Sequence, residues 1–110
     1  MSRSVDQRFD DILTAIDRCL GYRTDLDSAD EHIASMAMDA VLRNLAVIGE
    51  AVRALPQAET AAMPEVEWAS IAGLRNVVIH EYFRIEPEVI VDILDNDLVP
   101  LATALRARHR

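Results

Sequence analysis

One uninterrupted apolar seam constrains this chain more than any other feature. Between residues 34 and 55, apolar side chains recur at alternating steps of four and three without a slip. This heptad-like spacing is typical of a helix that packs against partner helices along its whole length. The sequence therefore predicts an all-α fold around one long helix. The members of the seam are Ala34, Met38, Val41, Leu45, Ile48, Val52 and Leu55.

The flanking sequence indicates a second long helix before the seam. Apolar residues recur at helical spacing from about Ser4 to Leu20, and Gly21 is expected to end this helix. The stretch SADE, from Ser28 to Glu31, matches a capping box and is expected to begin the seam helix. Pro56 is expected to end it, and the following stretch PQAETAAMPEV is interpreted as a loop.

Further helices are expected in the second half of the chain. A third spans about Val66 to Phe83, and a fourth opens at Glu86-Pro87, because proline suits a first helical turn. Pro100 either kinks the fourth helix or lies in the first turn of a fifth, from about Asp97 to Arg108. We therefore expect one domain over residues 1–110, an up-and-down bundle of four to five helices.

The core of such a bundle is small and mostly aliphatic. Hydrophobic residues make up 51% of the chain, but aromatic residues make up only 5%. A chain of 110 residues can bury one core of modest size. Small all-α domains of this kind often gain stability by pairing, so we expect a homodimer.

The charge balance limits the kind of partner. The net charge is −8, and all eleven basic residues are arginine. This acidity argues against a protein that coats nucleic acid nonspecifically, but it allows a narrow arginine-lined groove for a selective RNA such as tRNA. Basic residues are dense only at the C-terminus. There, Arg106, Arg108, His109 and Arg110 form either a solvated helix end or a contact to RNA or a partner.

Cysteine usage and hydropathy suggest a compartment. Cys19 is the single cysteine, and one thiol cannot form an intrachain disulfide. The first ten residues are polar and charged, unlike a secretory signal. The apolar runs are too short to span a bilayer. We expect a cytoplasmic protein without membrane contact.

The third expected helix carries two neighbouring stripes. Arg75 falls on an otherwise apolar face with Trp68, Ile71, Val78, Ile79 and Tyr82. Beside it runs a small, polar stripe formed by Ala69, Gly73, Asn76 and His80. A glycine inside a helix costs about 1 kcal/mol relative to alanine. Gly73 is therefore expected where another backbone or a ligand must come close.

Arg75, Asn76 and His80 together suit RNA cleavage without a metal ion or cofactor. A neutral histidine can take a proton from a 2′-hydroxyl, an arginine can bind the phosphate, and an asparagine can orient either group. One helix supplies one histidine, so a two-fold dimer is needed to bring two histidines to one cleft.

A plainer interpretation of the same residues stays open. His80 can be a hydrogen-bonded structural residue at a helix edge. Arg75 can pair with a carboxylate such as Glu50, and Tyr82 can belong to the core. Asn76 can be an exposed polar residue without a role.

Two segments resemble a known family. GLRNVVIHEYF (Gly73 to Phe83) is similar to the Arg-His signature of the HEPN superfamily, and HEY completes the Arg-x4-His-x-Tyr form of the HepT-like toxins. DAVLRNLAVIGEAVRALP (Asp39 to Pro56) resembles the second helix of that family. The resemblance covers roughly Phe9 to Leu105.

The resemblance implies the toxin of a type VII-like toxin–antitoxin module, a dimeric ribonuclease that cleaves tRNA or mRNA. Arg75 and His80 would be catalytic, and Asn76 would support them. The antitoxin would be an MntA-like minimal nucleotidyltransferase that transfers AMP from ATP to Tyr82. AMP there would place a phosphate beside Arg75 and block RNA. Glu50, in the matching second helix, is expected to orient Arg75.

Two alternatives belong to other classes. The chain can be a non-catalytic HEPN module that binds a nucleotidyltransferase partner or a nucleotide without cleaving RNA. It can also be a purely structural helical dimer, in which substitution of Arg75 or His80 changes stability alone.

Overall fold

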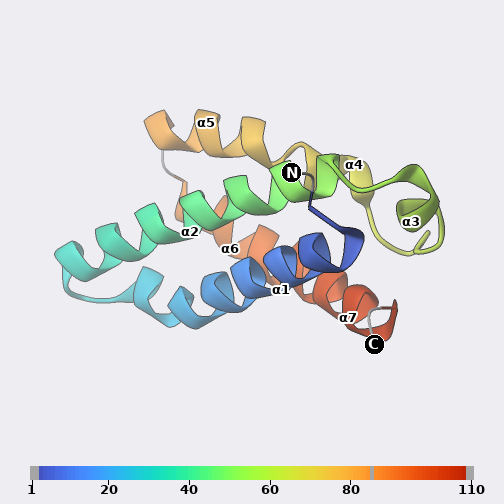
Figure 1. Ribbon diagram of the computed structural model, residues 1–110. Helices are drawn as coiled ribbons and strands as arrows, with labels where there is room; N and C mark the ends of the chain where they lie inside the picture. Colours follow the sequence, from blue (N-terminus) through green and yellow to red (C-terminus); the bar gives the residue numbers. More distant parts are fainter. Residues whose placement is uncertain (1–2, 85, 109–110) are drawn as a thin grey trace.

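The computed structural model describes residues 3–84 and 86–108, with the backbone alone for residues 81–83. Every regular element in these ranges is helical, which confirms the predicted all-α class. Figure 1 shows two long antiparallel helices at the centre, with one helix above them and the C-terminal helices behind them. The described part of the chain therefore forms a helical bundle of the predicted kind.

The helical hairpin consists of α1 (Val5–Tyr22) and α2 (Glu31–Arg53), joined through a 3₁₀ turn, η1 (Thr24–Asp27). Ser4, where the first helix was expected to start, is the N-cap of α1. Its hydroxyl accepts from Gln7 N at 3.1 Å, and Gln7 Oε1 accepts from Ser4 N at 2.8 Å. This reciprocal capping box satisfies two amides that the first turn leaves free.

Two expected boundaries of the hairpin are wrong. α1 continues through Gly21 to Tyr22, because Gly21 keeps its helical conformation. The cap of α2 is Asp30 rather than Ser28: the Asp30 carboxylate accepts from His32 N at 2.9 Å. Ser28 Oγ instead accepts from Asp30 N at 3.1 Å, which turns the chain before the helix starts.

The segment after α2 is less irregular than expected. It contains a short helix, α3 (Gln57–Ala61), where the sequence indicated only a loop. The expected helix from Val66 to Phe83 is two helices, α4 (Trp68–Ala72) and α5 (Leu74–Arg84), separated at Gly73. In Figure 1, α5 lies along the side of α2 that faces away from α1.

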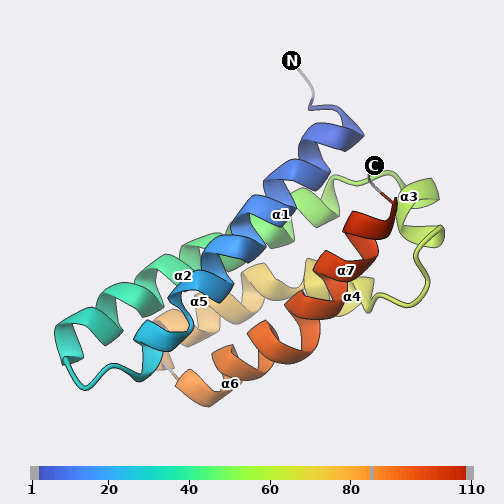
Figure 2. The same cartoon turned by 90° about the horizontal axis from the view of Figure 1, so that it is seen from below.

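The last layer is one continuous helical rod. α6 (Pro87–Asp92) begins with Pro87 in its first turn, as expected. A π-helical segment, η2 (Ile93–Leu98), leads directly into α7 (Val99–Arg108), and Figure 2 shows the rod running alongside the hairpin. Pro100 lacks an N–H for the regular helical ladder. The wider turns just before it let the rod continue into α7, which has Pro100 in its first turn as expected of the fifth helix.

The predicted seam of α2 is the centre of the core. Ala34, at its first turn, is half-buried, and every other member is at most 8% exposed. The seam packs on the buried face of α1 and on the rod. The largest fully buried side chains of these partners are Phe9, Ile12, Ile16, Ile90, Leu94, Leu98, Leu101 and Leu105.

No helix in the described ranges combines the length and the apolar character that a membrane crossing requires.

Candidate active site

The first turn of α5 is placed by the break at Gly73. Gly73 N donates to Ala69 O at 3.1 Å and closes α4, and Gly73 O accepts from Asn76 N at 3.0 Å. The sequence placed Arg75 on one apolar face with Trp68 and Ile71. Because the helix restarts here, Arg75 lies on a different helix from these two residues. The motif residues belong to a helix of their own.

A close backbone approach holds this turn against α2, and it occurs at Gly49 rather than Gly73. A Cβ at Gly49 would lie 3.3 Å from Arg75 N and 3.6 Å from Ile71 O. At Gly73, a Cβ would meet only carbonyl oxygens of the preceding turn, Ala69 O at 3.4 Å and Ser70 O at 3.5 Å. The expected glycine of close approach is therefore on α2.

Glu50, next along α2, forms an ion pair with Arg75. Arg75 Nη1 donates to Glu50 Oε1 at 2.7 Å. The side chains are 55% and 56% exposed, so Arg75 lies at the surface and not on a buried face. An exposed pair contributes little to stability. Its effect is to set the direction of the guanidinium, which has further N–H donors for a ligand.

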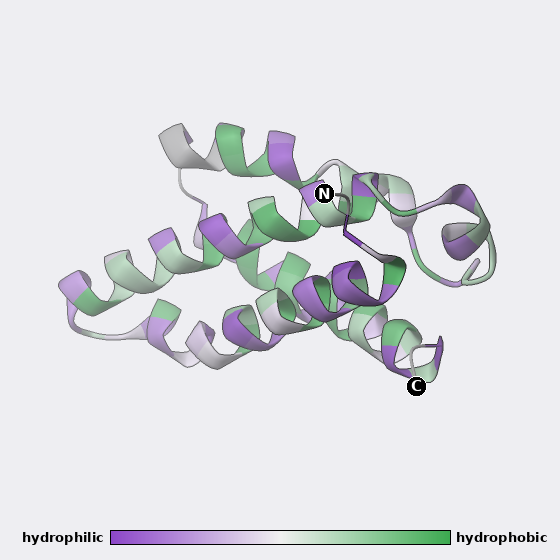
Figure 3. Cartoon of the chain, viewed as in Figure 1, coloured by the Kyte–Doolittle hydropathy of each residue, from purple (hydrophilic) through white to green (hydrophobic). Residues whose placement is uncertain are grey.

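Asn76 and His80 lie one turn apart on α5, and both are exposed. Between them, Ile79 is 54% exposed. Figure 3 shows a hydrophilic first turn of α5 followed by a hydrophobic one. Arg75, Asn76, Ile79 and His80 therefore form an open surface, which we call the motif face.

Four further expected site residues are not part of the motif face as described. Tyr82 lies in α5 by its backbone, but its side chain is outside the described residues, as is Arg110. Arg106 donates to Asp17 and Arg108 donates to Glu59, each at 3.0 Å. Both arginines are on α7, which lies across the bundle from α5 in Figure 1. Their predicted contact to RNA stays a prediction.

Two supporting residues were missed in the sequence. Besides Gly49, Arg53 contacts the same junction, with its Nε donating to Ala72 O at 3.3 Å. This bond satisfies a carbonyl at the end of α4. A signal for both residues was present in the sequence. Gly49 precedes Glu50 directly and Arg53 follows it by one helical turn, so all three lie close together on α2.

The sequence model of a family described as "Ribonuclease HepT-like" matches residues 12–108. The chain belongs to the HepT-like ribonuclease family. This confirms the resemblance found in the sequence, and with it the enzyme class, a ribonuclease. The match includes all of α2 and α5, and therefore Glu50 and the whole motif face.

Curated relatives agree with this HepT-like assignment. "Putative RNase MJ0127" of Methanocaldococcus jannaschii is 39% identical over 87 residues, which cover 78% of this chain and 71% of the relative. "Putative RNase MJ1380" of the same organism is 33% identical over 80% of this chain and 81% of the relative. "Probable ribonuclease HepT" of Thermococcus cleftensis is 29% identical over 92% of each chain. No solved structure matches significantly.

Proposed function

We propose that this HepT-like ribonuclease is the toxin of a two-gene toxin–antitoxin module. It cleaves RNA internally and without a metal ion, at a cleft shared by two copies of the chain. The observation that carries this proposal is the motif face: an arginine with free donors, an asparagine and a histidine, all exposed on one helix whose first turn is held by α2.

The three polar residues divide the chemistry of cleavage at a 2′-hydroxyl. His80 takes the 2′-hydroxyl proton while the 2′-oxygen attacks phosphorus. The bond to the 5′-oxygen breaks, and this oxygen receives a proton as it leaves. The products are a 2′,3′-cyclic phosphate and a free 5′-hydroxyl. Arg75 binds the phosphate and stabilises the charge that develops on it, and Asn76 orients the reacting groups.

A second chain completes this site. One motif face supplies one histidine, whereas removing a proton and returning one are separate tasks. His80 of the partner subunit donates the second proton. The exposed Ile79 provides apolar surface that pairing of two motif faces would bury. A two-fold axis along α5 would bring both sets of residues together.

Tyr82 is the proposed site of control. It follows His80 by two residues on α5. A minimal nucleotidyltransferase antitoxin would let the Tyr82 hydroxyl attack the α-phosphorus of ATP, so that an O–P bond forms, pyrophosphate leaves and the hydroxyl proton is lost. The attached AMP is anionic and bulky, and it would compete with RNA for Arg75.

The test is cleavage of cellular RNA by unmodified wild type and by His80→Ala, with EDTA present. General acid–base groups contribute ~10²–10⁴-fold to rate. We expect wild type to leave 2′,3′-cyclic phosphate ends and His80→Ala to lose at least ~100-fold of the rate. Circular dichroism checks that both proteins are folded, and mass spectrometry checks that Tyr82 carries no AMP.

Loss of cleavage on adding EDTA would contradict the metal-independent mechanism. Equal cleavage by both proteins would remove His80 from the site. No cleavage by either unmodified, folded protein would favour the non-catalytic module, which uses the same Arg75 site to bind a nucleotide or a nucleotidyltransferase partner.

A further inference from the structure

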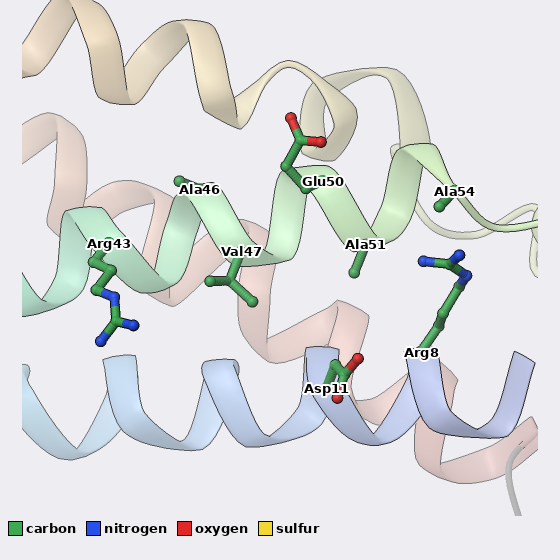
Figure 4. A pocket seen from close by; sticks show the side chains of 8 residues that line it. All are labelled: Arg8, Asp11, Arg43, Ala46, Val47, Glu50, Ala51 and Ala54. Atoms are coloured by element: carbon green, nitrogen blue, oxygen red, sulfur yellow. The ribbon is translucent and has the colours of Figure 1, made fainter. Parts of the chain in front are cut away.

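A shallow groove lies between α1 and α2, next to the motif face. Its cavity measures about 550 Å³, and Glu50 is one of its lining residues (Figure 4). A smaller cavity of about 200 Å³ continues it along the hairpin and shares Asp11, Arg43 and Val47 with it. Glu50 also binds Arg75, so the groove and the candidate active site meet at this residue.

Three arginines line the two cavities without a carboxylate partner among the described residues: Arg8, Arg18 and Arg43. The carboxylates of the groove are engaged elsewhere. Both oxygens of Asp11 accept from Arg3, at 2.6 and 2.8 Å, and Glu50 accepts from Arg75. The groove therefore keeps uncompensated positive charge in a protein whose net charge is −8. An anionic occupant matches this charge.

The arginines are spread along the groove. In Figure 4, Arg43 extends from α2 toward α1, whereas Arg8 extends from α1 toward Ala54, near the end of α2. From Arg43 to Ala54, α2 rises ~16 Å at 1.5 Å per residue. This length accommodates several consecutive phosphates, since a stacked strand advances ~3.4 Å along its axis per phosphate.

The floor of the groove limits what it can recognise. Ala46, Val47 and Ala51 lie between the arginines, and no aromatic side chain of the described residues lines either cavity. Bases that bind protein by stacking do so mainly on aromatic side chains. Guanidiniums without such partners contact phosphates and position the strand, but they do not read its sequence.

We propose that this groove binds the phosphate backbone of the substrate RNA beside the scissile bond and leads the strand to Arg75. This inference rests on the proposed ribonuclease function and assigns Arg8, Arg18 and Arg43 a role in substrate binding. The groove adds affinity that grows with RNA length and does not depend on base sequence.

Binding is measured by fluorescence anisotropy with labelled single-stranded RNA, in the His80→Ala background so that the RNA stays intact. The variants are Arg8→Gln, Arg43→Gln and the double variant. Each phosphate contact to a single strand contributes ~0.7 to the slope of log affinity against log salt concentration. At 0.1 M salt, one contact therefore corresponds to ~5-fold in affinity. We expect ~5-fold weaker binding for each single variant, ~25-fold for the double variant, and correspondingly shallower salt slopes.

Arg23→Gln is the matched control. It removes the same charge from α1's C-terminal end, where Arg23 is paired with Asp95 and is not a lining residue of the groove. Its RNA affinity should equal that of the parent. An equal loss in this control would show a general charge effect and overturn the assignment. So would unchanged binding in the double variant.

Cleavage separates this inference from the function it rests on. With His80 intact, the double variant should lose more kcat/KM on a long RNA than on a dinucleotide, because the dinucleotide does not reach along the groove. If wild type cleaves neither RNA while the double variant still binds RNA more weakly, the proposed function fails but the groove stands. Sedimentation showing that Arg8→Gln and Arg43→Gln dissociate a dimer, with RNA affinity per chain unchanged, would make the groove a protein interface and overturn the proposal.

Discussion

The Arg75 side chain is half-exposed, and its contact to Glu50 engages one nitrogen, Nη1. A phosphate arriving at Arg75 therefore finds free donors, but it also meets the Glu50 carboxylate. The carboxylate holds the guanidinium in one direction and repels a ligand that displaces it. Glu50 is thus a positioning residue in the proposed site, and its charge can be separated from its shape by substitution.

Glu50→Gln tests this role. The amide keeps the size of the side chain but loses the charge that orients Arg75. We expect kcat to fall ~10–100-fold, as for a misplaced catalytic group. KM should not rise, because the freed guanidinium still attracts phosphate. Thermal unfolding should change little, since exposed ion pairs contribute under ~1 kcal/mol.

Glu31→Gln, a substitution in the first turn of α2, is the control for loss of one surface carboxylate. Its cleavage rate should match that of wild type. Unchanged cleavage by Glu50→Gln would remove Glu50 from the site. A large drop in its melting temperature would instead assign it a structural role.

Gly49 and Gly21 form a second pair of variants at this scale. A Cβ at Gly21 meets nothing within 4 Å, whereas a Cβ at Gly49 lies 3.3 Å from Arg75 N. Alanine in a helix is favoured over glycine by ~1 kcal/mol. Chemical denaturation should show Gly21→Ala more stable than wild type by ~0.5–1 kcal/mol and Gly49→Ala without this gain.

The cleavage rate adds a second measurement on the same two proteins. Gly49→Ala should cleave RNA more slowly, because the first turn of α5 must shift to accommodate the methyl group. Gly21→Ala should cleave at the wild-type rate. Equal stability gains and equal rates in both variants would show that the contact between α2 and the α4–α5 junction has no consequence.

At the scale of elements, the π-helical segment η2 places two aspartates in opposite environments. Asp95 accepts two hydrogen bonds from Arg23, at 2.8 and 2.7 Å, and these lower the pKa of Asp95. Burial raises the pKa of Asp97, and the carboxylates of Asp92 and Glu67 raise it further. One turn of helix thus contains a carboxylate that favours the folded state when ionised and another that opposes it.

The two aspartates predict opposite responses to pH. Asp95 contributes to the stability of the folded state above its ordinary pKa of 3.8. This stabilisation is lost as the pH falls through the lowered pKa that Asp95 has in the folded state. Asp97 favours the folded state in its protonated form. This stabilisation is present below pH 3.8 and is lost as the pH rises through the raised pKa that Asp97 has in the folded state. At pH 7, we expect Asp95→Asn to lower the melting temperature and Asp97→Asn to raise it. Both differences should shrink on acidification below pH 4, and melting curves at several pH values measure them. Shifts of the same sign at pH 7 would contradict this assignment.

At the same scale, the sequence predicted the elements better than their ends. The seam of α2 was sufficient to place that helix, because periodicity is a local property. The capping box expected at Ser28 was not, since the cap of α2 is Asp30. The break at Gly73 was not predictable from the chain alone. The periodicity of Trp68, Ile71 and Val78 continues across Gly73, and the restart brings Arg75 N and Leu74 against Gly49. Tertiary contact overrides a periodicity of this kind.

At the scale of the whole molecule, the motif face is an open surface. A single chain exposes Arg75 and His80 to solvent, and Ile79 beside them is 54% exposed. Cleavage in a water-excluded site, where electrostatic stabilisation is strongest, therefore requires something to cover this face. In the proposed dimer, the cover is a second motif face.

Mixing wild type with an inactive protein tests the shared cleft. A heterodimer of wild type and His80→Ala keeps one His80, whereas the proposed mechanism uses His80 of both chains. After subunit exchange with an excess of His80→Ala, we expect cleavage per wild-type chain to fall as the fraction of heterodimer rises. Native mass spectrometry measures the fraction of heterodimer. Full exchange with unchanged cleavage per wild-type chain would contradict a cleft built from both chains.

The sequence by itself determined the helical class, the central position of the 34–55 seam, and the spacing of Arg75, Asn76 and His80. These depend on periodicity and local chemistry, which a linear pattern records. Only the tertiary structure decided that Arg75 lies at the surface beside Glu50, that Gly49 rather than Gly73 is the point of close approach, and that a groove with uncompensated arginines ends at the same place. Each of these depends on how α2 packs against α1 and α5, and residues distant in the chain meet only when their helices do.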